Sequence, residues 1–216
     1  ATLRALFDQR TLRCGSMSPE LRRCLEWWLC VLALDLAELR PWVRQTSRVV
    51  HLFCDAAGNP PHLGAVLVVG TRWYWTHCGV DSEVLGHFKR RRDSQIMGLE
   101  LLSITLGFCT FASQLKGRRV IVHSDNTGSE ACVRRGSARS MDHAQLVHAQ
   151  WTQAAVLAMS VFVKRVATDV NIADLPSRLE LEAMRALPWA TEVAPVLDSG
   201  FCAADSWEEL QERWRL

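Results

Sequence analysis

The sequence predicts an α/β fold in which a sheet of five strands is flanked by helices. Three observations support this class. Short apolar runs of strand length are followed by longer segments of helical periodicity. Glycine and proline separate the first three runs into a series. A later run is apolar throughout, which is typical of a strand buried on both faces of a sheet.

The N-terminal part, residues 1–47, is expected to form a helical extension. Ser18 is a suitable N-cap, and Pro19 follows at the first helical position, where the missing N–H of proline is tolerated. Apolar periodicity continues from there to about Leu39 and includes two adjacent tryptophans. We expect this helix to pack against the core or against a neighbouring domain.

Three strands are predicted next, over 49–54, 64–69 and 72–78. Segments 58–61 and 70–71 separate them, and both contain the glycine that marks turns. Connections this short join antiparallel neighbours, so the three strands are expected to form a meander.

The second half of the sheet alternates with helices. A broad apolar face predicts a helix over 94–115, and the apolar run 120–123 predicts the fourth strand. A short helix over 127–134 and a longer one over 141–159 are expected to follow, before alternation predicts the fifth strand over 160–166.

Four acidic residues stand at distinctive places in this order. Asp55 and Asp125 each follow an apolar strand, Glu100 lies inside the long helix, and Asp174 comes after the last strand. Carboxylates that converge on one point form a site for a divalent cation, because Mg²⁺ prefers hard oxygen ligands.

Four motifs surround these acids: Phe53-Cys54-Asp55-Ala56, Gly98-Leu99-Glu100-Leu101-Leu102, His123-Ser124-Asp125-Asn126 and Asn171-Ile172-Ala173-Asp174-Leu175-Pro176-Ser177-Arg178. In this order, the segment from 49 to 178 resembles the RNase H domain of retrotransposon reverse transcriptases, especially those of gypsy-like and DIRS-like elements. The last motif is the most specific of the four.

The resemblance implies an RNase H-like fold, with a five-stranded mixed sheet flanked by helices. Residues 48–178 would form the catalytic domain, and residues 1–47 would connect it to the polymerase part of the same polyprotein. Residues 179–216 are expected to form a C-terminal helical extension, with helices near 179–187 and 206–214.

The resemblance also implies an activity, the metal-dependent endonucleolytic hydrolysis of the RNA strand of RNA/DNA hybrids during reverse transcription. Asp55, Glu100, Asp125 and Asp174 would be both the catalytic residues and the ligands of two Mg²⁺ ions, for which Mn²⁺ can substitute. Two ions about 4 Å apart can generate the attacking hydroxide and stabilise the leaving oxygen. Many RNases H carry a histidine in the loop before the last aspartate, and residues 166–170 contain none. This predicts intact metal binding, with either slower turnover or an auxiliary role for Asp169.

The expected substrate contacts are Gly58 and Asn126 on the scissile strand, with Arg134, Arg135 and Arg139 as a basic handle between two helices. An RNA/DNA hybrid is read mainly through its shape, phosphates and 2′-hydroxyls. The partners expected are therefore the hybrid itself and the polymerase domain.

Composition agrees with a globular protein inside the cell, in the cytoplasm or the nucleus. The chain has 216 residues, is 49% hydrophobic and 22% charged, and has a net charge of +2. Its eight cysteines are scattered without a pair at metal-binding spacing, which favours buried thiols in a reducing compartment. No signal peptide is visible, and the apolar stretches are too short to span a membrane.

Other interpretations stay open at this point. Asp55 could form a turn, Asp125 could cap the next helix, Glu100 could face solvent, and Asp174 could cap a terminal turn. The chain could also be another nuclease of the same superfold, such as an exonuclease or an integrase-like enzyme. A non-catalytic module that binds hybrids or has a structural role is the remaining alternative.

Overall fold

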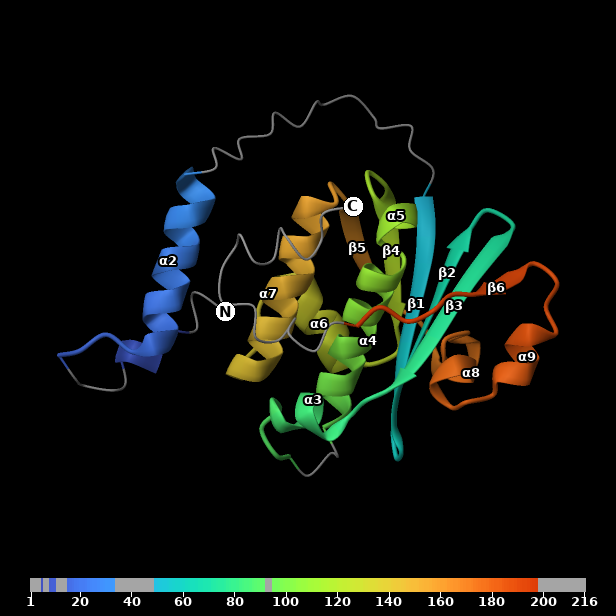
Figure 1. Ribbon diagram of the computed structural model, residues 1–216, viewed down its shortest axis with the longest axis horizontal. Helices are drawn as coiled ribbons and strands as arrows, with labels where there is room; N and C mark the ends of the chain where they lie inside the picture. Colours follow the sequence, from blue (N-terminus) through green and yellow to red (C-terminus); the bar gives the residue numbers. More distant parts are fainter. Residues whose placement is uncertain (1–4, 6–7, 11–14, 34–48, 92–94, 198–216) are drawn as a thin grey trace.

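The computed structural model describes residues 5, 8–10, 15–33, 49–91 and 95–197. Its centre is a mixed six-stranded sheet in the order β5-β4-β1-β2-β3-β6 (Figure 1). The strands are β1 (Val49–Gly58), β2 (Pro61–Val69), β3 (Arg72–Gly79), β4 (Arg119–Ser124), β5 (Ser160–Arg165) and β6 (Ala190–Glu192). The first three form the predicted antiparallel meander, whereas β4, β5 and β6 each pair in parallel with a neighbour.

The predicted count of five strands is wrong, because β6 adds a sixth. It lies in the C-terminal segment that was expected to be helical, and its three residues pair with Trp73–Trp75 of β3. This pairing satisfies backbone groups that the edge of β3 would otherwise expose. A strand of three residues is too short for alternation of side chains to reveal it.

The helices predicted over 127–134 and 141–159 are found with small shifts at their ends, whereas the one over 94–115 is divided at Phe111 and the short helices 82–86 and 174–177 were not predicted. The end predicted for the first helix, near Leu39, lies outside the described residues. The helices are α2 (Pro19–Ala33), α3 (Ser82–Gly86), α4 (Ile96–Thr110), α5 (Ala112–Leu115), α6 (Thr127–Arg135), α7 (Met141–Val156), α8 (Asp174–Ser177) and α9 (Leu181–Arg185), with a 3₁₀ turn at Thr168–Val170. The helix near 179–187 is confirmed as α9, and the helix expected near 206–214 lies outside the described residues. No described helix is both long and apolar enough to cross a membrane.

The N-cap of α2 is confirmed. The Oγ atom of Ser18 accepts a hydrogen bond from the backbone N–H of Leu21 at 3.2 Å, and Pro19 is the first helical residue. The helix lies to one side of the sheet in Figure 1, where the indole of Trp27 contacts the ring of His148 on α7 at 4.6 Å between centroids.

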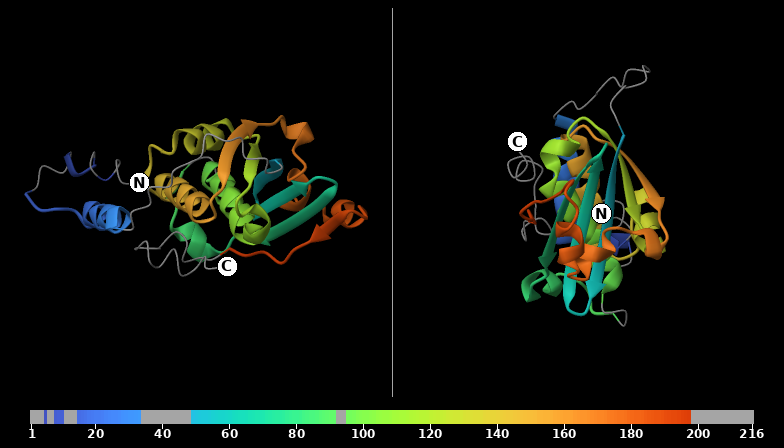
Figure 2. Two further views of the ribbon diagram at one scale, coloured as in Figure 1. Left: turned by 90° about the horizontal axis from the view of Figure 1, so that it is seen from above. Right: turned by 90° about the vertical axis from the view of Figure 1, so that its right-hand side faces the viewer.

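The two faces of the sheet are covered unequally (Figures 1 and 2). One face packs on α4, which is apolar on all sides and almost wholly buried; Val50, Leu52 and Cys54 of β1 point into this large core. The other face carries a smaller cluster under α8 and α9, formed around Val66 and Trp75. Within the described residues no disulfide is formed, and Cys54, Cys109 and Cys132 are buried.

A candidate metal centre

Asp55 and Asp125 lie side by side because their strands are parallel neighbours. β1 and β4 are paired up to Phe53 and His123, and each acid comes two residues after that pair. Asp55 is in the body of β1 and is 5% exposed, whereas Asp125 follows the end of β4 and is half-buried. The juxtaposition expected of the first and fourth strands is therefore confirmed.

Glu100 reaches the same point from α4. This helix packs against β1 and β2, and Glu100 is 4% exposed although leucines flank it on both sides. The backbone N–H of Ala56 donates a hydrogen bond to the Glu100 carboxylate. Its Oε2 atom is buried with no hydrogen-bond partner in the described part of the chain.

One oxygen from each of Asp55, Glu100 and Asp125 lies within 4.8 Å of the others. This is the only group of three or more candidate ligands that the described residues bring together. The set consists of hard oxygen donors, and the buried Oε2 of Glu100 lacks the partner that a buried polar atom normally has. The three residues therefore fit a divalent cation, without specifying Mg²⁺.

Burial and mutual repulsion perturb two of these carboxyl groups. Desolvation, followed by the charges of Asp55 and Asp125, raises the pKa of Glu100 to about 9. Desolvation also raises the pKa of Asp55 to about 6, and the hydrogen bond from Ser177 limits this rise. Both shifts have the direction expected when acids cluster in a buried place.

The segment after β5 holds Asp55 from the other side. The Oγ atom of Ser177 donates to Oδ2 of Asp55, and Nδ2 of Asn171 lies 3.5 Å from Oδ1 and 3.2 Å from the carbonyl oxygen of Cys54. α8 approaches the sheet at Gly64, the residue paired with Asp55 on β2. A Cβ atom at Gly64 would lie 2.5 Å from the Ser177 nitrogen, so this approach requires glycine.

Asp174 lies apart from the group of three. Its Oδ1 atom is 2.8 Å from Nε of Arg178, and its side chain is 26% exposed. Its charge nevertheless contributes to the raised pKa values of Asp55 and Glu100, and desolvation raises its own pKa. Of the four predicted ligands, the structure thus brings three together and places the fourth in an ion pair nearby.

The alternative structural roles of these acids do not match their surroundings. Asp55 is inside a strand and not in a turn, and Glu100 is buried. The N-cap of α6 is Asn126, whose Oδ1 accepts from the N–H groups of Gly128 and Ser129. The residue that precedes α8 is Ala173, so Asp174 is not its cap.

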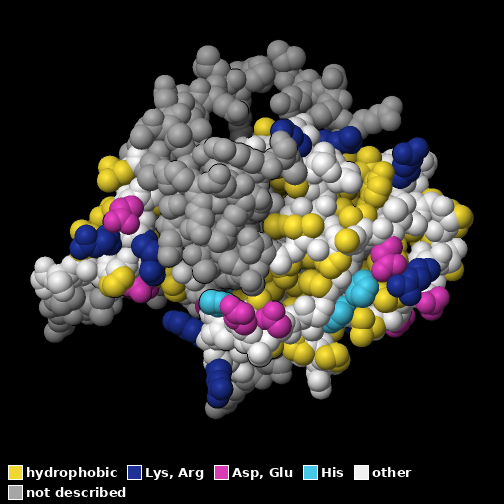
Figure 3. Space-filling model, in the orientation of Figure 1, with side chains coloured by type: hydrophobic (Ala, Val, Ile, Leu, Met, Phe, Trp, Pro, Cys, Tyr) yellow, Lys and Arg dark blue, Asp and Glu magenta, His cyan; other side chains and the backbone are white. Residues whose placement is uncertain are grey.

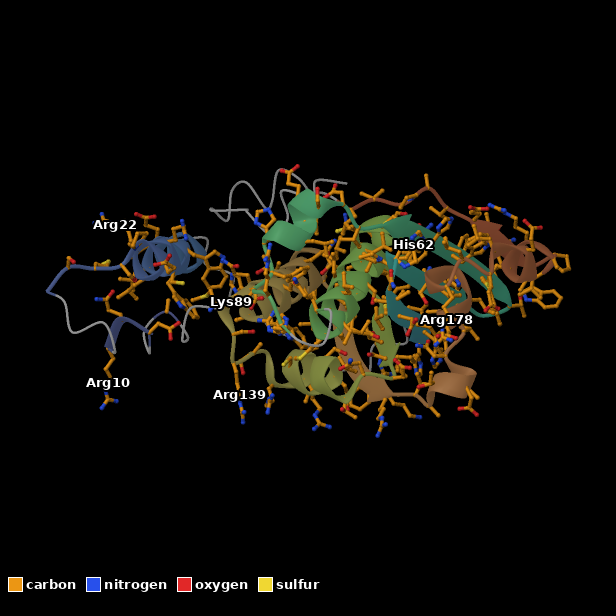
Figure 4. All side chains as sticks on the ribbon, turned by 90° about the horizontal axis from the view of Figure 1, so that it is seen from below. Arg10, Arg22, His62, Lys89, Arg139 and Arg178 are labelled. Carbon is orange, nitrogen blue, oxygen red and sulfur yellow. The ribbon has the colours of Figure 1, made fainter. Side chains whose placement is uncertain are left out.

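The predicted substrate contacts lie on separate elements. Gly58 ends β1, and Arg134 and Arg135 are in the last turn of α6, where Arg134 forms an ion pair with Glu130. Asn126 follows Asp125 directly; its Nδ2 atom has no partner among the described residues. In Figure 4, Arg139 lies toward the same end of the molecule as Lys89.

Basic side chains are dispersed on the face seen in Figure 3, where Lys and Arg lie mostly at the periphery and hydrophobic side chains gather in the middle. A net charge of +2 agrees with this dispersion. Attraction of a polyanion would therefore depend on a few local cations and not on the field of the whole protein.

His123 is a packing residue. It is buried, its ring stacks on Phe53 at 4.2 Å between centroids, and its Nε2 lies 3.0 Å from Nδ1 of His51. Burial, with the neighbouring His51 and Lys164, lowers the pKa of His123 to about 4. The imidazole is thus neutral near pH 7.

Sequence reasoning missed the roles of Asn171, Ser177 and Gly64. The first two belong to the motif that ends at Arg178, so their spacing from Asp174 was the available signal. Nothing local marks Gly64, because its role arises from the close approach of α8.

A scan of the chain against models of known protein families finds no match, and a search of curated proteins finds no significant match either.

Proposed function

We propose that this chain has an RNase H-like fold and is a metal-dependent endoribonuclease that hydrolyses the RNA strand of RNA/DNA hybrids during reverse transcription of a retroelement. The observation that supports this best is the group of Asp55, Glu100 and Asp125, whose oxygens lie within 4.8 Å of one another. Two of these acids come from neighbouring parallel strands and the third from the helix beneath them. Asp174, nine residues after the end of β5, is the fourth acid of the proposed site.

The three clustered carboxylates would hold one Mg²⁺ or Mn²⁺ ion, and Asp174 would contribute to a second position. Bound metal would lower the pKa of a water and stabilise the charge that develops on the leaving oxygen. The protein's own part is to fix the donors. Ser177 and Asn171 orient the Asp55 carboxylate, and Ala56 N–H orients that of Glu100.

The protein also keeps water from competing for these donors. Asp55 and Glu100 are at most 5% exposed, so their charges act in a medium where electrostatic interactions are strong. Asn126 is placed to donate from Nδ2 to the substrate strand, since its Oδ1 atom is occupied by the cap of α6. The arginines of α6 would contact phosphates farther along the hybrid.

The proposal is tested with the full chain and a labelled RNA/DNA hybrid, with single-stranded RNA and duplex DNA as controls, in Mg²⁺ and in EDTA. We expect cleavage of the hybrid alone, only with metal, and its loss in Asp125→Asn. Glu182→Gln is the matched control, because the Glu182 side chain is 90% exposed and outside the acid group. Cleavage that persists in EDTA or in Asp125→Asn would contradict the proposal.

A second measurement tests metal binding without turnover, in case cleavage requires the polymerase partner. Mg²⁺ or Mn²⁺ should raise the Tm of the wild type and of Glu182→Gln, and should not raise that of Asp125→Asn, because a ligand that binds only the folded state stabilises it. A non-catalytic module would show hybrid binding without this metal-dependent shift.

A further inference from the structure

The ion pair between Asp174 and Arg178 places a cation at the edge of the acid group. Nε of Arg178 lies 2.8 Å from Oδ1 of Asp174, one helical turn apart, and the Arg178 side chain is 56% exposed. Arg178 also acts to lower the pKa values of both Asp55 and Asp174. Among the described residues it is therefore the cation whose charge both of these acids sense.

The two terminal nitrogens of Arg178 are available to a ligand. The closest contact with Asp174 is through Nε, and no hydrogen bond from Nη1 or Nη2 is found among the described residues. A guanidinium presents its donors as a planar fork, which matches two oxygens of a phosphate. In Figure 4 Arg178 lies beside α8, next to the sheet that carries the acids.

The backbone of this segment is held while its side chains can exchange partners. Ser177 is bonded to Asp55, and the close approach of Ala173 and Ser177 to Gly64 seats α8 on β2. The Asp174 and Arg178 side chains, in contrast, are partly exposed. The Oδ1 atom of Asp174 is buried, but the Arg178 end of the pair is exposed to solvent, which lowers the cost of exchanging that end for another partner.

We propose that Arg178 is a substrate-positioning residue: it neutralises Asp174 in the free protein, then binds a phosphate of the scissile strand and leaves the Asp174 carboxylate to the metal centre. This inference rests on the proposed function. It couples two events: when the phosphate arrives, Arg178 moves from Asp174 to the phosphate, and the Asp174 carboxylate becomes available to the metal centre.

The charges favour a different partner of Arg178 in each state, Asp174 in the free protein and a phosphate in the complex. Without substrate, the carboxylates of Asp55, Asp125 and Asp174 repel one another, and Arg178 offsets part of that repulsion. A hybrid brings phosphates that the acids would repel, so the cation at the edge supplies the attraction. An arginine that turns to the phosphate leaves Asp174 with a free carboxylate, which a divalent cation then neutralises.

Arg178→Gln tests the inference through two equilibrium measurements that should move in opposite directions. Affinity for an RNA/DNA hybrid in EDTA should fall roughly 3- to 10-fold, and the slope of log K against log salt should become shallower by about one phosphate contact. Affinity for Mn²⁺ without hybrid, from titration calorimetry, should rise severalfold because a competing cation is removed.

Two further variants make the result specific. Arg178→Lys keeps the charge, so it should restore the salt slope, but it lacks the fork and should restore the affinity only in part. Arg185→Gln is the matched control: Arg185 is also a partly exposed arginine paired with carboxylates, on α9, and it should leave both equilibria unchanged.

The outcomes separate this inference from the function it rests on. If Arg178 only stabilises α8, its loss should weaken Mn²⁺ and hybrid binding together, which would overturn the inference. Wild-type metal and hybrid binding that Arg178→Gln leaves unchanged would also overturn it, with the nuclease proposal intact. A wild type that binds no Mn²⁺ at all would overturn both.

Discussion

The two halves of the candidate site handle negative charge in different ways. On β1, on α4 and just after β4, the carboxylates of Asp55, Glu100 and Asp125 come together, and burial raises the pKa of the first two. On α8, Asp174 is partly exposed and has its own counter-ion in Arg178. In the first half, burial and neighbouring acids raise the pKa values of the carboxyl groups, whereas in the second an arginine is paired with the acid.

This difference indicates which half is built for metal and which for exchange. Carboxylates buried together are unfavourable in a protein that has no other use for them, since each loses hydration without gaining an opposite charge. A surface ion pair has no comparable cost. The buried half should therefore dominate metal binding, and the α8 half should respond to substrate.

The largest effect that would sharpen this comparison is expected for Glu100→Gln. The amide keeps the shape of the side chain but cannot supply a second anionic oxygen to the metal. A catalytic metal is worth several kcal/mol, so kcat/KM for hybrid cleavage should fall roughly 100- to 1,000-fold. Glu83→Gln, at an exposed glutamate of α3, should cleave normally, and a loss below about 10-fold at Glu100 would contradict its assignment as a ligand.

Gly64→Ala should break the contact between the two halves. The added Cβ would lie 2.5 Å from the Ser177 nitrogen and 2.7 Å from the Ala173 oxygen, both backbone atoms of the α8 region. Overpacking of this kind costs about 1 to 3 kcal/mol, measurable as a lower urea midpoint. Gly86→Ala meets no atom within 4 Å, so equal destabilisation by both variants would rule out a specific role of Gly64.

The sequence predicted the regular elements well because their signals are local. The Ser18 cap, the turn after β2 and the apolar run of β4 each depend on neighbouring residues, and each is found where expected. Three of the acids were also marked locally, since Asp55 and Asp125 follow apolar runs and Glu100 interrupts one. The sequence could not predict whether Glu100 lies on a buried or an exposed side of α4. This helix is apolar on all sides and has no polar stripe to mark a solvent-facing side.

The parts that were missed depend on contacts between distant segments. β6 is a strand only because β3 offers it an edge, and Gly64 matters only because α8 lies on it. The grouping of Asp55, Glu100 and Asp125 without Asp174 also depends on contacts between distant segments. Asp174 and Arg178 are four residues apart, a spacing that allows an ion pair on a helix, but the exchange proposed for this pair cannot be predicted from the spacing.

A smaller effect is expected on the pH dependence of stability in the metal-free protein. Burial raises the pKa of Glu100 in the folded protein to about 9, above its pKa in the unfolded chain. Its contribution to the free energy of unfolding is therefore fully present below the unfolded pKa and is lost as pH rises toward 9. Between pH 6.5 and 8 the wild type should lose roughly 1 to 2 kcal/mol relative to Glu100→Gln in urea unfolding. The histidine contributions are common to both proteins and cancel. A constant difference across this range would show that Glu100 ionises normally.

The smallest effect concerns the link between the halves, the hydroxyl of Ser177. Its hydrogen bond favours the ionised form of Asp55 and limits the rise of that pKa to about 6. Ser177→Ala should therefore raise the Asp55 pKa further and reduce Mn²⁺ affinity at pH 6 more than at pH 8, where the carboxyl group is ionised anyway. Unfolding free energy should fall by about 1 kcal/mol, as for one hydrogen bond. Ser113→Ala, at an exposed serine of α5, is the control. An equal loss of Mn²⁺ affinity at both pH values would mean that Ser177 positions the oxygens of Asp55 and does not tune its charge.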